Sequence, residues 1–455
     1  MNLNTISPID NRYYEKVKQI SVFFSLESWI KYRLRIEVHY LESLISKLLD
    51  VSPEFRERYY LTDIDLKIFK DKLNTFERDC DVKDILAIER QTRHDIKAIE
   101  YYIGNQIKNM DEKYHSFVNF IHFGLTSQDI NSVAFSCQLK NTITISIIPT
   151  MNHLLEHLEQ LISTTEGIVM LGHTHGQPAI PTNIGKEFEV FVQRLNYWGK
   201  KLSNFEYYTK MGGALGGLNA HNYAYPDIDW DDFFDDLTNK LGLKRWNKTT
   251  QITNYDDIVD LFGIIVGINN ILIDLSQDCW LYISKGYFKL KCEKDQVGSS
   301  TMPQKVNPIN FENAEGNLKV ANSGFNMLID KLPVSRLQRD LTDSTVLRNV
   351  GVYFAHTILS YDNIMEGLSK LEVNDVLIYK DLEAHPECLS EAIQILMKIF
   401  NIENGYDIVR QVTQNNKFND LEELKQKIID HMDQNDIGYD SEFIEKLIDL
   451  NYNNY

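Results

Sequence analysis

The sequence predicts an all-α protein, and three observations support this fold class. Apolar residues recur at steps of three and four along three long segments, residues 129–162, 184–205 and 255–290. Strand-like alternation of apolar and polar residues is scarce. Hydrophobic residues make up 43% and aromatic residues 11% of the 455 residues, which is sufficient for a buried core. Helices of this length cover their apolar faces best side by side in a bundle, which either one chain or several subunits could complete.

The pattern divides the chain into three predicted domains. Residues 1–112 hold shorter helices and end near the polar sequence NMDEKYH. Residues 113–369 contain the long helices. Residues 370–455 form a smaller helical module with amphipathic runs at 421–432 and 443–450. This last module is typical of a solvated cap, and nothing in it indicates chemistry.

The charge balance argues against nucleic-acid and membrane partners. The chain has 65 acidic and 47 basic residues, a formal net charge of −18, which repels phosphate backbones and anionic lipid over most of the surface. A small anionic substrate is still compatible with this charge, because a few arginine and lysine residues can reverse the field inside a cleft.

Cysteine usage and the chain's N-terminal sequence favour a cytoplasmic location. The cysteines are odd in number and lack CxxC spacing, as expected of free thiols in a reducing compartment: Cys80, Cys137, Cys279, Cys292 and Cys388. The first residues, MNLNTISPIDNRYY, lack the basic-then-apolar layout of a signal peptide. The most apolar stretch, residues 261–275, is too short and too polar to span a bilayer.

The most informative segment is GSSTMPQKVNP, residues 298–308, which we call the 298–308 loop. A glycine opens it, three hydroxyl side chains follow, and two prolines bracket a lysine and an asparagine. Such a loop can supply a small base in Ser299 or Ser300, backbone donors for a developing anion, and the cation Lys305 for a substrate carboxylate. The alternative interpretation is an ordinary surface loop, but loop polarity alone does not require this residue order.

Further segments accompany this loop in a fixed order. They are SPIDNRYYEKV, ERQTRHDIKAIEY, FIHFGLTSQDI, GHTHGQPAIPTNIGKE and TTQI before the loop, and FENAEGNL and KLPVSRLQRDLTDSTVLRN after it. Together these segments resemble the fumarase/aspartase superfamily and, within it, the bacterial-type adenylosuccinate lyase family. The resemblance implies a three-domain all-α fold whose central long-helix bundle forms the core of a homotetramer, with each active site assembled from three chains. It also implies cleavage of adenylosuccinate, and of SAICAR, with release of fumarate and without a metal or organic cofactor.

Eliminating fumarate requires a base, a cation for the carboxylate and an acid for the departing nitrogen. By the resemblance, Ser299 is the base, and Lys305 with Asn307 binds the carboxylate. A serine hydroxyl does not normally ionise near neutral pH, so amide dipoles and Lys305 would have to stabilise the alkoxide once the loop closes. The acid is His175, since histidine donates readily near pH 7 and the polar bend HTHGQP is expected to lead into a helix. The resemblance pairs His175 with Glu312, which would fix the tautomer and raise the imidazole pKa.

Taken singly, His175 would more often be a structural residue, and we assign no role to His173.

The remaining candidate residues are substrate contacts. RHD (Arg93, His94, Asp95) and HFGLTSQD (His122, Thr126, Ser127) combine imidazoles with hydroxyls, which suits hydrogen bonds to the succinyl carboxylates. In SRLQRDLTDSTVLRN, three polar residues follow one another at spacings of five and four and can converge on one phosphate: Arg339, Ser344 and Arg348. The resemblance adds Arg12, Tyr13 and Gln251 as further contacts.

Other interpretations of the chain remain open at this stage. The glycine-rich stretch GGALGGLNAH, residues 212–221, does not match GxGxxG, and we predict no strand before it, so a dinucleotide site is not expected. A different fumarate-forming lyase, such as argininosuccinate lyase or fumarase, would be expected to lack the SRxQRDLTDS segment. A non-catalytic structural protein on the same fold could keep the helices while losing the residues that carry chemistry.

Overall fold

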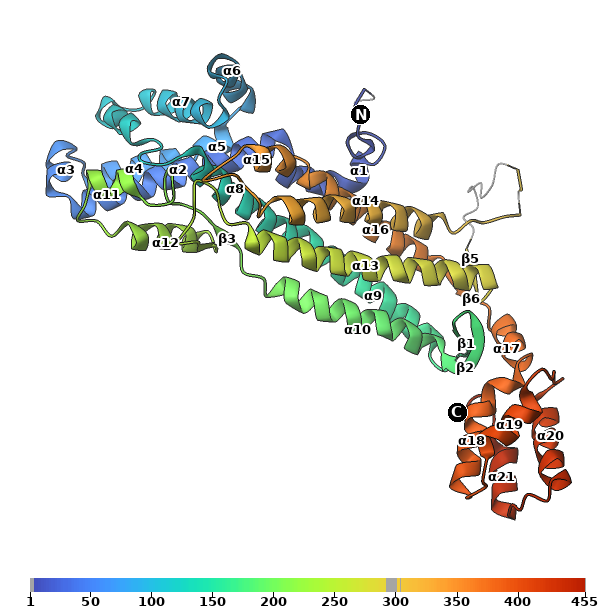
Figure 1. The fold of residues 1–455 in the computed structure, drawn as a ribbon. Coiled ribbons are helices and arrows are strands. Elements are labelled where there is room, and N and C mark those ends of the chain that lie inside the picture. Colours follow the sequence, from blue (N-terminus) through green and yellow to red (C-terminus); the bar gives the residue numbers. More distant parts are fainter. Residues whose placement is uncertain (1–3, 292–300, 303, 455) are drawn as a thin grey trace. The chain divides into compact units, whose positions relative to one another are not determined.

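The structure, a computed structural model, describes residues 4–291, 301, 302 and 304–454 (Figure 1). Two of the sequence-based predictions, the base Ser299 with its neighbour Ser300 and the free thiol Cys292, lie outside the described residues. The chain forms two compact units. One comprises Met1–Met151, Trp198–Asn270 and Gly316–Tyr361, and the other comprises Asn152–Tyr197, Ile271–Glu315 and Asp362–Tyr455.

Helices dominate both units. In chain order they are α1 (Tyr14–Phe24), α2 (Leu26–Val51), α3 (Pro53–Arg58), α4 (Asp63–Leu73), α5 (Phe76–Asp79), α6 (Val82–Thr92), α7 (Asp95–Lys108), α8 (Ser127–Thr142), α9 (Ile148–Thr165), α10 (Ile184–Ser203), α11 (Asn219–Ala224), α12 (Trp230–Lys240), α13 (Asp256–Lys285), α14 (Ile309–Lys331), α15 (Thr342–Leu347), α16 (Val350–Ser369), α17 (Asp375–Glu383), α18 (Ser390–Ile399), α19 (Gly405–Thr413), α20 (Leu421–Gln434) and α21 (Ser441–Asp449). Short 3-10 turns form η1 (Pro8–Asp10), η2 (Glu112–Phe120) and η4 (Pro386–Leu389), and a π-helical turn, η3 (Ile143–Ile147), joins α8 to α9.

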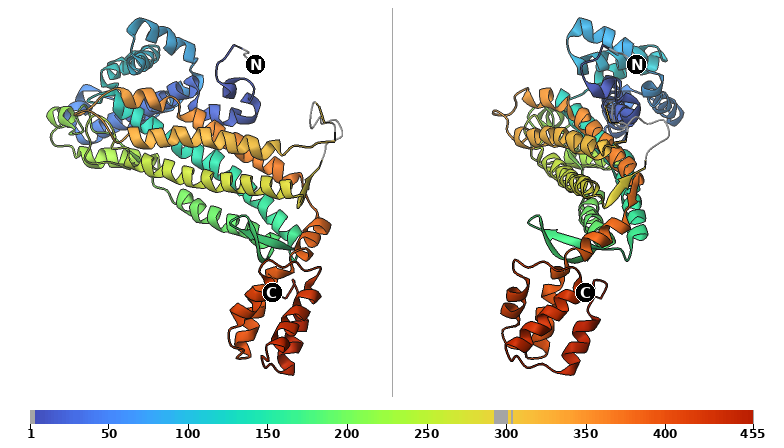
Figure 2. Two further views of the ribbon diagram at one scale, coloured as in Figure 1. Left: turned by 45° about the vertical axis from the view of Figure 1, so that its right-hand side comes forward. Right: turned by 90° about the vertical axis from the view of Figure 1, so that its right-hand side faces the viewer.

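Three long helices, α13, α14 and α16, each have part of their length in the first unit, where they pack through aromatic rings and an amide network. In Figures 1 and 2, α13, α14 and α16 run alongside one another. Phe325 of α14 lies with its ring centroid 5.1 Å from Phe262 of α13 and 5.1 Å from Phe354 of α16. In the same layer, the buried Asn269 donates to Asn322 Oδ1 at 2.9 Å. These contacts bury part of the apolar face of α13 that the three- and four-residue spacing of residues 255–290 predicted.

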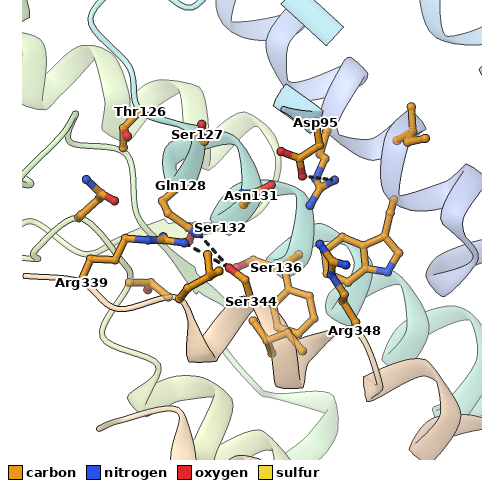
Figure 3. A pocket seen from close by; sticks show the side chains of 18 of the residues that line it. Asp95, Thr126, Ser127, Gln128, Asn131, Ser132, Ser136, Arg339, Ser344 and Arg348 are labelled. Atoms are coloured by element: carbon orange, nitrogen blue, oxygen red, sulfur yellow. Dashed lines mark hydrogen bonds and ion pairs between the residues drawn. The ribbon is translucent and has the colours of Figure 1, made fainter. Parts of the chain in front are cut away.

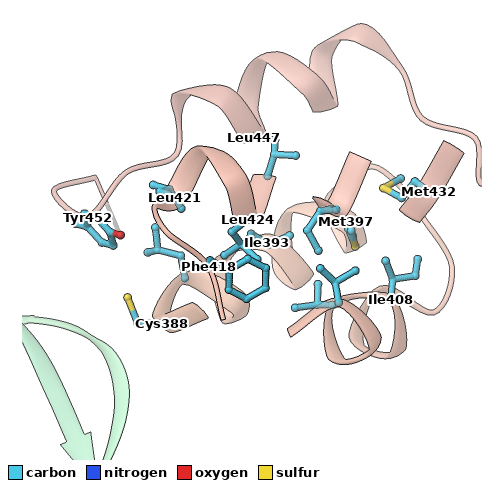
Figure 4. Close-up of a cluster of buried hydrophobic side chains, with 14 of the residues drawn as sticks. Cys388, Ile393, Met397, Ile408, Phe418, Leu421, Leu424, Met432, Leu447 and Tyr452 are labelled. Atoms are coloured by element: carbon cyan, nitrogen blue, oxygen red, sulfur yellow. The ribbon is translucent and has the colours of Figure 1, made fainter. Parts of the chain in front are cut away.

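The second unit contains the C-terminal helices, which share their own hydrophobic core (Figure 4). Side chains from α18 to α21 form this core, among them Ile393, Met397, Leu424, Phe443 and Leu447. The predicted amphipathic runs near residues 421–432 and 443–450 are therefore helices α20 and α21, and their apolar faces point into this cluster.

Strands are few and short among the described residues. They are β1 (Val169–Thr174), β2 (Gln177–Asn183), β3 (Tyr208–Thr209), β4 (Lys244–Arg245), β5 (Phe288–Leu290) and β6 (Leu371–Val373), and they pair as three two-stranded sheets. The pairs β1–β2 and β5–β6 are antiparallel, and β3–β4 is parallel.

Two local expectations are wrong. The polar bend around His175 is the turn of the β1–β2 hairpin, and the next helix begins only at Ile184. The glycine-rich stretch is preceded by a strand after all, the two-residue β3. Both departures arise because backbone pairing, and not an alternating sequence pattern, defines these strands: β3 has only two residues, and β1 and β2 contain a glycine and two prolines.

The all-α fold class is confirmed. By length and composition one described helix, α13, could cross a membrane, but 56% of its most apolar window is buried inside the protein, as in the core helix of a bundle.

The three predicted domains and the two compact units are different kinds of division. The predicted domains are continuous segments of the sequence, whereas each compact unit is defined by packing and contains three separate stretches of chain. The three-domain division and the tetramer stay predictions.

Candidate active site

A cavity of about 790 Å³ in the first unit gathers most of the predicted substrate contacts (Figure 3). Its walls come from α2, the turn between α6 and α7, the start of α8, the segment before α13, and the region around α15. The predicted residues that line it are Arg93, His94, Asp95, Thr126, Ser127, Gln251, Arg339, Ser344 and Arg348. Segments more than 200 residues apart in the sequence, from Arg93 to Arg348, therefore meet at one place.

The start of α8 holds Thr126 and Ser127 at the cavity through a buried carboxylate. Asp129 accepts from the backbone N–H of Thr126 at 2.8 Å and so completes the N-terminal capping box of this helix. It also accepts from the N–H of Gly212 at 2.8 Å and pairs with Lys210 Nζ at 2.6 Å, and both charged side chains are fully buried. Asp129 thus ties the TSQD segment to the glycine-rich stretch, which is a structural role that the sequence did not reveal.

His94 is held by the helix that follows it. It is the N-cap of α7, and its Nδ1 accepts from the backbone N–H of Lys97 at 3.2 Å. Because Nδ1 acts as an acceptor here, the ring proton resides on Nε2. His94 is half-exposed and lines the cavity, so this Nε2–H is available as a donor to an anionic ligand.

Arg339 and Ser344 are joined directly. Arg339 Nη2 donates to Ser344 Oγ at 3.3 Å, as the dashed line in Figure 3 marks. Gln128, with its amide oxygen turned toward the guanidinium, accepts from Arg339 Nη2 at 2.9 Å. The neighbouring Asp343 is buried and accepts from the Tyr255 hydroxyl at 2.8 Å. The spacing argument that placed Arg339 and Ser344 together is consistent with this contact.

Arg33 is a cavity residue that the sequence analysis missed. It lies on α2, pairs with Asp95 Oδ2 at 3.1 Å, and stacks its guanidinium 5.2 Å from the centre of the Trp29 ring. Burial and the nearby charge of Arg348 act to lower the pKa of Arg33, and Asp95 opposes them. The one sequence signal for the contact between Trp29 and Arg33 was their four-residue spacing on a helix. This spacing is also common in solvent-exposed helices, so it did not identify Arg33 as a cavity residue.

The cavity is positively charged although the chain is acidic. Four arginines line it, Arg33, Arg93, Arg339 and Arg348, against two carboxylates, Glu89 and Asp95. In a chain with a formal net charge of −18, this arrangement concentrates positive potential where an anion would bind.

Three predicted contacts of the first unit lie outside the cavity lining. His122 instead places Nδ1 2.5 Å from Oε1 of the fully buried Glu37. Burial would lower the pKa of His122, but the charge of Glu37 and the hydrogen bond to it together raise that pKa above its usual value. Arg12 and Tyr13 lie beside each other at the start of α1, with the guanidinium carbon 6.0 Å from the ring centre.

The predicted acid belongs to the second unit. His175 and Gly176 are the two central residues of the β1–β2 turn, with φ of +54° and +72°. Both angles are left-handed, as two-residue hairpin turns of type I′ require, and histidine adopts this region uncommonly. The imidazole is therefore presented at an exposed hairpin tip.

Glu312, the proposed partner of His175, and the proposed carboxylate ligands Lys305 and Asn307 lie in the same unit. Glu312, in the first turn of α14, accepts from Trp280 Nε1 at 3.0 Å, and among the described residues no hydrogen bond joins it to His175. Asn307 lines a small cavity with Phe311, and Lys305 donates its backbone N–H to Met302 at 3.1 Å. The pairing of His175 with Glu312 stays a prediction. No group of three or more His, Cys, Asp or Glu side chains that could hold a metal ion occurs within the described part of the chain.

Comparison with known proteins identifies the family. The family described as Lyase matches residues 65–321, and the family described as Adenylosuccinate lyase C-terminal matches residues 335–455. The chain is 45% identical to the adenylosuccinate lyase of Dictyostelium discoideum over 416 residues, which are 90% of this chain and 88% of that protein. This chain belongs to the adenylosuccinate lyase family. It is also 39% identical to the adenylosuccinate lyase of Escherichia coli (strain K12) over 430 residues, 94% of this chain and 92% of that one.

Solved structures support the fold. The fumarate lyase from Mesorhizobium sp. BNC1 superimposes with a TM-score of 0.73 at 16% identity, covering 96% of this chain and 94% of that one. The β-carboxy-cis,cis-muconate cycloisomerase from Acinetobacter calcoaceticus sp. ADP1 gives a TM-score of 0.71 at 15% identity, covering 98% and 96%. These likenesses concern the fold alone, and they agree with the fumarase/aspartase-like fold that the motifs predicted.

Proposed function

We propose that this chain cleaves adenylosuccinate to AMP and fumarate, and SAICAR to AICAR and fumarate, in purine nucleotide biosynthesis. The observation that carries the proposal is the arginine-rich cavity of the first unit, which nine of the predicted substrate contacts line. Both substrates combine a phosphate with a dicarboxylate, and arginine guanidinium groups bind both kinds of oxyanion through paired hydrogen bonds.

The proposed reaction is an anti β-elimination that needs no cofactor. Ser299 takes a proton from the carbon next to a succinyl carboxylate, and the electron pair of that C–H bond forms the C=C bond of fumarate. The C–N bond breaks, and the nitrogen receives a proton from His175. Lys305 and Asn307 hold the carboxylate on which negative charge develops, which lowers the barrier by stabilising the transition state more than the bound substrate.

The resemblance to the family supports an active site that is shared between chains. His175 stands at a hairpin tip of the second unit, and the phosphate-binding candidates line a cavity of the first. We propose a homotetramer in which one chain supplies the cavity and others supply the hairpin and the 298–308 loop. A cytoplasmic location, without nucleic-acid or membrane partners, fits the acidic composition and the absence of CxxC spacing.

A direct assay tests the proposal. The purified chain is incubated with adenylosuccinate, and release of AMP and of fumarate is measured separately, with argininosuccinate as a parallel substrate and the His175→Ala variant as a control. We expect equal amounts of AMP and fumarate from the wild-type chain, at least about 10²-fold less from the variant, and no cleavage of argininosuccinate. Turnover of argininosuccinate alone would overturn the proposal, and nucleotide binding without any turnover would favour a non-catalytic protein.

A further inference from the structure

His173, the first histidine of HTHGQP, makes two hydrogen bonds that fix its tautomer. Its Nδ1 lies 3.0 Å from the carbonyl oxygen of Leu171, and its Nε2 lies 2.8 Å from Lys285 Nζ. A carbonyl can only accept, so Nδ1 carries the proton, and Nε2 is left to accept from the ammonium group. Burial and the charge of Lys285 lower the pKa of His173, which favours the neutral ring that this geometry requires.

Lys285 stands where α13 turns toward the 298–308 loop. It is the last residue of α13, and Gly286 follows with φ of +80°, a C-terminal glycine that lets the chain reverse. The chain then enters β5, which pairs with β6, and the N–H of Lys291 donates to the Lys370 carbonyl at 2.8 Å. Lys285 is therefore the last helical residue before the segment of chain that precedes the loop.

A third element completes the cluster. Lys285 Nζ lies 5.7 Å from the centre of the Tyr287 ring, and the buried Tyr287 hydroxyl donates to Asp381 of α17. His385, just beyond the end of α17 and before η4, places Nδ1 3.8 Å from Asp381 Oδ1. The charged and titratable groups around His173 are thus Lys285 on α13, Asp381 on α17 and His385 between α17 and η4.

We propose that His173 and Lys285 are positioning residues that fix the hairpin turn bearing His175 to the C-terminal end of α13. All of these segments belong to the second unit, and His175 is only two residues beyond His173 in a turn with left-handed backbone angles. An exposed turn of this kind has few contacts of its own, so a bond at the last residues of β1 limits how far the imidazole can move. The inference rests on the proposed role of His175 as the acid.

The geometry predicts which substitutions matter. Lys285→Met keeps the length of the side chain but removes the donor, and His173→Leu removes the acceptor. Lys285→Arg keeps both donor and charge. We expect Lys285→Met and His173→Leu each to lower kcat about tenfold with little change in KM, because displacement of the acid affects the transition state and not substrate binding. Lys285→Arg should retain most of the activity.

The double variant tests whether the two side chains act through each other. If they do, His173→Leu combined with Lys285→Met is no slower than the slower single variant, because the second substitution has nothing further to remove. Multiplicative losses would mean that the two residues act independently, and they would overturn the proposal. Thermal unfolding of each variant shows whether a loss of kcat is merely a loss of folded protein.

A second readout does not depend on lyase activity. Diethyl pyrocarbonate modifies neutral imidazoles, and peptide mass spectrometry gives the modification rate of His175 at each pH in the full-length protein. We expect Lys285→Met to change the modification rate of His175 and Lys285→Arg to leave that rate near the wild-type value. Identical His175 profiles in all three proteins would refute the positioning role. If the profiles differ but the wild-type chain cleaves no adenylosuccinate, the proposed function fails and the positioning inference stands.

Discussion

Asp129 connects the start of α8, which lines the cavity, to the glycine-rich stretch. Its carboxylate is fully buried between Lys210 and the backbone N–H groups of Thr126, Gly212 and Gly213. A buried ion pair of this kind adds little when intact, but removing one partner leaves a charge without compensation. The pair therefore holds two segments of the site in place, and losing either partner should lower the stability of the protein strongly.

Substituting Lys210 tests this role. We expect Lys210→Met to lower the free energy of unfolding by about 3 to 5 kcal/mol, because it strands the Asp129 carboxylate in the interior. The matched control is Lys244→Met, which breaks the exposed ion pair of Lys244 with Glu206, 2.5 Å apart, and should lower the free energy of unfolding far less, because solvent screens this pair. Urea unfolding of both variants measures the difference. Similar losses in the two variants would contradict the account of Asp129.

The Glu37–His122 pair predicts a dependence of stability on pH. The raised pKa of His122 means that the pair contributes its full stability below about pH 6.5 and loses it as the pH rises through the folded-state value. Each unit by which the pKa is raised corresponds to about 1.4 kcal/mol. The Glu37→Gln variant lacks the charge that raises this pKa. The decline in stability between pH 6.5 and 8.5 should therefore be smaller in this variant than in the wild-type chain.

The control for this pair is Glu27→Gln on the same helix, where Glu27 pairs with Lys31 on the surface. Thermal unfolding midpoints measured across that pH range should decline alike in this variant and in the wild-type chain. A Glu37→Gln variant that declines as steeply as both would show that His122 does not titrate as described.

At the scale of single residues, the sequence predicted the polar groups that a ligand would need better than the groups that support them. Arg339 and Ser344 could be placed together from their spacing, and the structure joins them at 3.3 Å. The positions of Arg33 and Asp129 could not be predicted. A helical pattern does not show which carboxylate or guanidinium becomes buried, because burial depends on segments that are distant in the sequence. The roles assigned to the predicted site residues stay predictions.

At the scale of elements, α14 and α16 approach closely at a glycine. A Cβ at Gly324 would lie 2.2 Å from Cε1 of Tyr353 on α16, whereas a Cβ at Gly316, on the same helix, would meet no described atom within 4 Å. Gly324→Ala should therefore destabilise the protein by about 1 to 3 kcal/mol despite alanine's better helix propensity. Gly316→Ala should stabilise it by up to about 1 kcal/mol. Urea unfolding midpoints that shift in the same direction in both variants would contradict this packing.

The long helices were predictable as elements, and the short strands were not. Residues 184–205 and 255–290 carry enough apolar repeats to identify α10 and α13 within a few residues of their ends. The β1–β2 hairpin has no such repeat, because its strands contain Gly172, Pro178 and Pro181 and depend on cross-strand pairing. For this reason the bend around His175 was expected to lead directly into a helix.

At the scale of the whole molecule, the account requires more than one chain for each active site. Ser299→Ala and His175→Ala should each be nearly inactive, yet a mixture of the two should regain part of the activity after subunits exchange, because some sites then receive both intact groups. The assay is adenylosuccinate cleavage before and after mixing, with exchange confirmed by mass spectrometry of mixed oligomers. Mixed oligomers without recovered activity would contradict shared sites.

The most direct measurement of the central claim is a crystal structure of the chain with AMP and fumarate bound. The account predicts the AMP phosphate within hydrogen-bond distance of Arg339, Ser344 and Arg348 in the cavity of one subunit. It also predicts that fumarate there lies between a His175 and a Ser299 supplied by neighbouring subunits. Nucleotide bound outside this cavity, or fumarate within reach of neither group, would contradict it.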